Sequence, residues 1–145
     1  MSCIRHLQAA RSGKQNIAEA SMASATSKET EIKLTNVARA SLEELKIDYE
    51  DFLRTNKLEL WGIDHSLTKR FREINRTPNA TYQTYRKAIE NPEPCICANS
   101  MICLISIVTY LLNQQIKALE KAFINEGGLR ERMTKARIDK RNSNK

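Results

Sequence analysis

The sequence predicts an all-α protein, an up-and-down antiparallel helical bundle, and three observations support this prediction. Glycine and proline, which interrupt helices, number only 4 and 3 among 145 residues. Ala, Leu, Ile, Lys and Glu fill long stretches that contain no turn signal. Apolar residues recur every three or four positions through residues 95–125, which is the period of a helix with one buried face. A chain of this length corresponds to a single domain with a real core.

Residues 95–125 form the helix around which we expect the others to pack. Pro94 stands at its entrance and Gly127 and Gly128 just beyond its end, where proline and glycine favour helix boundaries. Residues 101–112 have almost no polar side, so neighbours should cover them from several directions. The predicted inward stripe of the later part is Ile105, Val108, Leu112, Ile116, Leu119 and Phe123.

A membrane span is the alternative for this segment, because residues 94–116 carry no charge. Polar residues interrupt it, and its strongest apolar core, residues 101–112, is shorter than the roughly 20 residues that a bilayer requires. We therefore expect a buried bundle helix and no membrane partner.

The same periodicity and turn signals place five more helices. They are expected at residues 4–22, from about 27 to 55, 66–74, 80–90 and 129–137, with the last five residues frayed. The stripe of the second helix is Leu34, Val37, Ala38, Leu42, Leu45, Tyr49, Phe52 and Leu53. The predicted organisation is a bundle domain at 1–128, in which 57–94 is a helical insertion or cap, followed by a basic C-terminal tail at 129–145.

The net charge of +7 is concentrated at the two ends of the chain. Residues 129–145 carry seven Lys/Arg and two Asp/Glu, and residues 1–28 carry four and one, so the remainder is almost neutral. Such a distribution indicates an acidic partner, RNA or DNA ahead of anionic lipid. A solvated tail that only aids solubility is the alternative.

The cations expected to neutralise phosphates, without reading bases, lie in the first helix and the tail. They are Arg11, Lys14, Arg130, Arg132, Lys135, Arg137, Lys140 and Arg141.

Residue patterns that carry catalysis or bind metals are weak here. His6 and His65, the only histidines, lack the glutamate three positions earlier that a di-iron bundle needs. Cys95 and Cys97 would point their thiols apart on a helix, so Cys95, Cys97, Cys103 and Cys3 read as reduced thiols of a cytoplasmic protein. We predict no enzymatic activity, no metal and no cofactor.

An acidic cluster in the second helix could serve a metal-dependent enzyme, although structural pairing on a solvated face is the favoured interpretation. The cluster is Glu43, Glu44, Asp48, Glu50 and Asp51.

Three segments together resemble a bacterial four-helix-bundle family, the 23S rRNA-intervening-sequence proteins. They are QAARSGKQNIAEAS at 8–21, ETEIKLTNVARASLEELKIDYEDFL at 29–53, and LEKAFINEGGLRERMTKAR at 119–137. The last resembles the branch described as carrying a four-helix-bundle suffix domain. The resemblance covers most of the chain outside residues 57–90.

This resemblance implies an up-and-down bundle, assembly into a homo-oligomeric ring that is a pentamer, and no known catalysis. A related protein, the accessory variability determinant of diversity-generating retroelements, is a basic ring that binds nucleic acid and a reverse transcriptase. The chain departs from the family at Ala20, where glycine is usual, and only seven residues precede Gln8 where the family has a long helix. We expect the first helix of the family to be missing, which exposes an apolar groove that residues 66–90 or another subunit must cover.

The sequence therefore leads to a non-enzymatic, cytoplasmic, oligomeric helical bundle that binds RNA or DNA non-specifically through phosphates. The competing class is a protein scaffold whose groove docks a partner helix, with no nucleic-acid role.

Overall fold

The structure of the chain, a computed structural model, describes residues 3–23 and 27–143, with side chains from Gln8 onward apart from Leu129. Every regular element in these ranges is an α-helix, which confirms the predicted all-α class. The helices are α1 (Cys3–Ala23), α2 (Lys28–Thr55), α3 (Ser66–Asn75), α4 (Tyr82–Ile89), α5 (Pro94–Glu126) and α6 (Leu129–Ser143).

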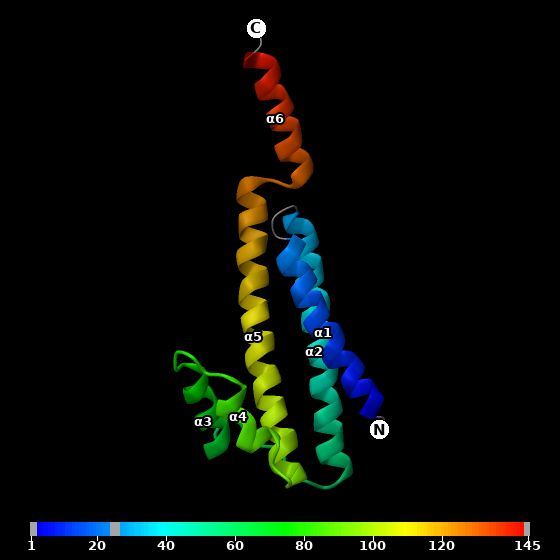
Figure 1. Ribbon diagram of the computed structural model, residues 1–145, viewed down its shortest axis with the longest axis vertical. Coiled ribbons are helices and arrows are strands. Elements are labelled where there is room, and N and C mark those ends of the chain that lie inside the picture. Colours follow the sequence, from blue (N-terminus) through cyan, green and yellow to red (C-terminus); the bar gives the residue numbers. More distant parts are fainter. Residues whose placement is uncertain (1–2, 24–26, 144–145) are drawn as a thin grey trace.

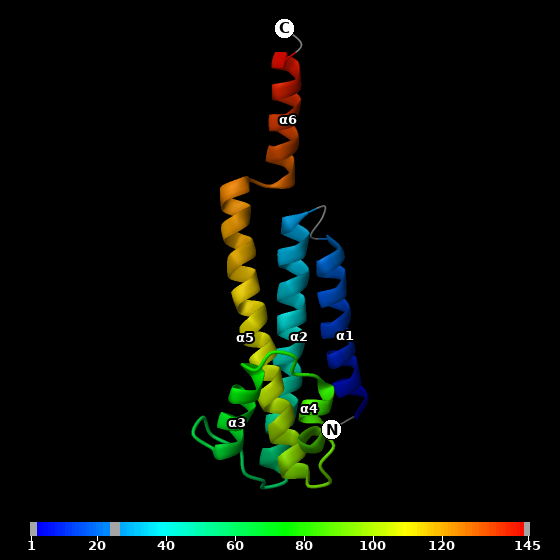
Figure 2. The same ribbon diagram turned by 60° about the vertical axis from the view of Figure 1, so that its left-hand side comes forward.

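Helices α1, α2 and α5 alternate in direction, and α2 lies between the other two (Figures 1 and 2). With 28 and 33 residues, α2 and α5 are about 42 and 50 Å long, so they pair along most of their lengths. On α5, one line of buried positions alternates in steps of four and three residues, the spacing of knobs-into-holes packing. On α5 the buried seam is Ala98, Ile102, Ile105, Thr109, Leu112 and Ile116.

The seam corrects the predicted stripe of α5 at one position. Val108 is 37% exposed, and Thr109 is buried in its place. The hydroxyl of Thr109 donates to the carbonyl oxygen of Ile105 at 3.0 Å, so the polar group is satisfied inside the seam. Val37 of α2 is likewise an exposed member of its predicted stripe.

Small residues let α1 approach α2 closely. A Cβ atom added to the buried Gly13 would lie 3.3 Å from the Leu42 side chain. Ser12 and Ser41 share a hydrogen bond between their hydroxyls at 3.3 Å across the same contact.

Helix α2 itself begins at a cap, because the Ser27 hydroxyl accepts the backbone N–H of Thr30.

Helices α3 and α4 form a side arm beside the N-terminal half of α5 (Figure 1). Phe71 of α3 is buried and stacks on Tyr85 of α4, with ring centroids 5.6 Å apart. Both helices of the arm also contact α5, so residues 66–90 cover part of it.

The cover over the apolar segment of α5 is incomplete, in contrast to the prediction for residues 101–112. Val108, Tyr110 and Leu111 are 37%, 62% and 52% exposed. The reason is geometric: α2 takes one face of α5 and the short arm reaches only its first half, which leaves a lateral face open. By length and composition alone, the helical stretch that begins at Pro94 could cross a membrane, but many core helices of soluble proteins share these properties. In the most apolar 18-residue segment of this stretch, 39% is buried.

Helix α6 continues to Ser143, well past the predicted end at Arg137, so the described part of the basic tail is helical. Gly127 adopts φ 74°, a left-handed conformation that glycine allows, and turns the chain out of α5. The Glu131 carboxylate accepts the backbone N–H of Gly128 at 3.2 Å and so fixes the start of α6. As a result α6 projects beyond the end of the bundle (Figures 1 and 2).

Candidate nucleic-acid interface

The predicted cations of the tail all lie on α6 and are all exposed. They are Arg130, Arg132, Lys135, Arg137, Lys140 and Arg141. None of the six forms an ion pair within the part of the chain that the structure describes. Their charge is therefore available to a ligand.

Three of these cations form a row along one side of α6. At about 100° per residue, Arg130, Arg137 and Arg141 lie within roughly 40° of one another around the helix. Their steps along the axis are about 10.5 and 6 Å, and successive phosphates of one DNA strand rise about 3.4 Å. We call these three residues the α6 row. A polyanion that lies along α6 would meet all three guanidinium groups.

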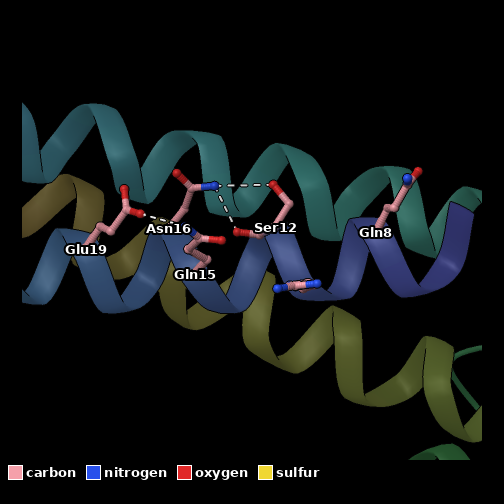
Figure 3. A pocket seen from close by; sticks show the side chains of 6 residues that line it. Gln8, Ser12, Gln15, Asn16 and Glu19 are labelled. Carbon is pink, nitrogen blue, oxygen red and sulfur yellow. Dashed lines mark hydrogen bonds between the residues drawn. The ribbon is translucent and has the colours of Figure 1, made fainter.

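Arg11 and Lys14 are exposed on α1, so the structure places them on a different helix from the α6 row. Arg11 lines an open hollow of ≈ 420 Å³ on the side of α1. In Figure 3 the labelled side chains that line this hollow follow one another along α1, next to α2. The lining residues are Gln8, Arg11, Ser12, Gln15, Asn16 and Glu19.

Hydrogen bonds within α1 already use much of this hollow's polarity. Gln15 donates to Glu19 at 3.0 Å, and Asn16 donates to the Ser12 carbonyl oxygen at 2.8 Å (Figure 3). One arginine and one glutamate give the hollow no net charge. The hollow is lined mainly by amide and hydroxyl side chains. Concentrated positive charge is found on the α6 row and not in this hollow.

The α3–α4 arm is a second basic surface that the sequence interpretation missed. Residues 66–90 carry six Lys/Arg and two Asp/Glu, whereas residues 29–65 carry five and nine. Over residues 29–128 taken together, 13 Lys/Arg and 14 Asp/Glu nearly cancel, so the basic arm does not stand out. The signal was present in the sequence, and counting the charge of each predicted helix separately would have found it.

Two ion pairs lower the pKa of exposed carboxyl groups near the basic surfaces. Lys28, at the start of α2, pairs with Glu126, at the end of α5, and this hydrogen bond lowers the pKa of the Glu126 carboxyl. On α4, the Arg86 guanidinium donates to Glu90 at 2.8 Å and lowers the pKa of that carboxyl. Arg86 is thus engaged, in contrast to the cations of α6.

The cysteines of α5 face different neighbours. The thiol of Cys97 donates to the Ile89 carbonyl oxygen at 3.0 Å, and that of Cys103 lies 3.9 Å from the Thr68 hydroxyl. Burial raises the pKa of both thiols, which disfavours reactive thiolates. Cys3 lies outside the described side chains. Among the residues described, no three His, Cys, Asp or Glu side chains are placed to hold a metal ion.

Part of the acidic cluster of α2 is paired within its own helix. Asp51 accepts from Arg54 at 2.8 Å, and Glu50 lies 4.0 Å from the Lys46 ammonium. These contacts are those of a solvated helix face.

No family model, curated protein or solved structure matches this chain. The resemblance to the 23S rRNA-intervening-sequence proteins thus stays a prediction.

Proposed function

We propose that this chain is a non-enzymatic, cytoplasmic protein that binds RNA or DNA through backbone phosphates, with α6 as its main contact. The observation that carries the proposal is that α6 projects from the bundle and holds six exposed cations that form no ion pair with the described carboxylates. Each phosphate that such a cation neutralises releases a condensed counterion, which drives binding.

The composition of α6 supports low sequence specificity. It contains no aromatic residue on which a base could stack. The asparagine and glutamine side chains that read adenine are limited to Asn142, next to its end. Binding should therefore depend on charge and be similar for different sequences.

We propose further that the chain forms a homo-oligomer, for which the family resemblance suggests a pentamer. The open face of α5 supports this proposal, because Val108 and Leu111 lie on one side of the helix and are both exposed. They belong to residues 94–116, which carry no charge that would oppose burial. A second subunit seated on this face would remove that area from water.

A mobility-shift titration at about 50 and 200 mM salt tests nucleic-acid binding. A protein with six to ten phosphate contacts loses about 10³- to 10⁵-fold in affinity over this range. The chain ended after Gly128 should bind more weakly and show a smaller salt effect. The absence of a shift at low salt would exclude the proposal.

The same open face favours a second candidate function, a scaffold that docks a partner helix without any nucleic acid. Such a complex would be stoichiometric, would resist nuclease and would tolerate removal of α6. A third class, a metal-dependent enzyme that uses the acidic cluster, predicts a higher melting temperature with divalent metal than with chelator. These measurements separate all three.

A further inference from the structure

Helix α3 and Arg76, the residue that caps its C-terminus, carry a second row of cations. Lys69, Arg72 and Arg76 are spaced three and four residues apart, which places them within roughly 60° of one another around the helix. We call these three residues the α3 row. Phe71, the buried residue of α3, faces the arm's core, so the row points away from it.

The α3 row is exposed and weakly engaged. All three side chains are exposed. Lys69 lies 3.7 Å from Asp64, whose carboxylate is 91% exposed, and such a surface pair contributes little. Arg72 and Arg76 form no ion pair within the described ranges.

The two rows lie at different ends of α5 (Figures 1 and 2). The Thr68 hydroxyl lies 3.9 Å from the Cys103 thiol, which sets the level of α3 along α5. From Cys103 to the end of α5 at Glu126 the helix rises about 35 Å, and α6 begins beyond that point. The rows are therefore too far apart to contact the same few phosphates.

Along residues 103–116, the part of α5 next to the α3 row, the surface between the rows does not favour phosphates. No charged residue occurs on α5 between Pro94 and Ile116, and its open face there exposes Val108 and Leu111. A phosphate chain laid over this face would lose hydration without meeting a cation.

We propose that the α3 row is a second phosphate-binding site and that each chain bridges two separate duplex segments, one on the α3 row and one on the α6 row. This inference rests on the proposed nucleic-acid binding and extends it from one contact to two. It gives the long, neutral α5 the role of a spacer between the sites.

The test measures how many short duplexes each full-length chain binds. The probe is a DNA hairpin with a stem of about eight base pairs, about 27 Å long at 3.4 Å per pair, which is shorter than the estimated 35 Å gap. The variant is Lys69→Gln, Arg72→Gln and Arg76→Gln. The matched control is Lys33→Gln, Lys117→Gln and Lys121→Gln, which removes the same charge from exposed positions outside both rows.

Sedimentation at low salt should give two hairpins per chain for the wild type and the control, and one for the α3 variant. Circular dichroism checks that each variant stays helical. Expressed per chain, the ratio does not depend on the number of subunits. Replacing the α6 row with glutamine should likewise leave one hairpin, and both sets together none.

Two results would overturn the inference. One hairpin per wild-type chain, unchanged in the α3 variant, would mean that the α3 row does not bind. One per wild-type chain with weaker binding in the α3 variant would mean that a single duplex contacts both rows. If the wild type binds no hairpin at low salt, the proposed function itself fails, which is a different outcome from either.

Discussion

The side-chain oxygen of Asn99 accepts the backbone N–H of Trp61 at 2.9 Å, although the two residues are 38 positions apart. Asn99 is 1% exposed, and its amide nitrogen donates to the carbonyl oxygens of Glu59 and Cys95, each at 2.8 Å. One buried amide thus joins the segment after α2 to the first turns of α5. The α3–α4 arm follows this segment directly, so its position depends on the same contact.

Asn99→Ala should destabilise the fold by about 2 to 3 kcal/mol, because it removes three hydrogen bonds made by a buried side chain. Urea unfolding measures the change in the free energy of unfolding. Asn113→Ala, an exposed position on the same helix, is the control and should change it by less than about 0.5 kcal/mol. Equal effects at both positions would show that the Asn99 contacts do not hold the arm.

Leu53→Ala should cost about 2 to 5 kcal/mol, since Leu53 is 1% exposed and packs with Ala98 and Ile102 in the core. Leu111→Ala removes the same atoms from a position that is 52% exposed, so its cost within one chain should be well below that. Denaturation at the lowest measurable protein concentration compares the two. A larger effect at Leu111 would contradict the α2–α5 seam as the core.

Leu111→Glu should convert the proposed homo-oligomer to monomers, because the charge would be buried at the subunit contact. Light scattering gives the molar mass. Asn113→Glu adds the same charge at an exposed position about 160° around α5 from Leu111 and serves as the control, which should keep the wild-type mass. If Leu111→Glu also keeps it, the open face of α5 is not the subunit contact.

The Lys28–Glu126 pair predicts a dependence of stability on acid pH. The pKa of Glu126 is lowered in the folded chain, so its contribution is fully present above the unfolded value of about 4.3 and is lost as pH falls through the folded pKa. Lys28→Met should raise the pKa of Glu126 toward its ordinary value. An NMR titration of the Glu126 carboxyl reports this directly, and no change in its midpoint would rule out the pair.

Most helix positions could be predicted because boundary residues mark them. The predicted second helix, from about 27 to 55, matches α2 at Lys28–Thr55, since Ser27 caps its start. Val108 shows where periodicity fails. Steps of three and four residues are compatible with two adjacent faces of α5, one through Val108 and one through Thr109. The apolar side chain favours the face of Val108, but in the structure the face that packs against α2 is that of Thr109.

The candidate site could be predicted in part. The cations of α6 can be predicted because residues 129–145 keep a clear net positive charge, with no acidic segment beside them to offset it. The α3 row was missed because the excess of acidic residues at 29–65 offsets it in any long window. The outward direction of α6 also could not be foreseen, since it depends on the Gly127 conformation and the Glu131 contact.

The most direct test of the account is the slope of log affinity against log salt for duplex DNA, measured for the wild type and for Arg130→Gln, Arg137→Gln and Arg141→Gln combined. Three lost phosphate contacts should reduce the magnitude of the slope by about 2.7. The control triple variant at Lys33, Lys117 and Lys121 should keep the wild-type slope. An unchanged slope in the α6 variant, with binding retained, would contradict α6 as the main phosphate contact.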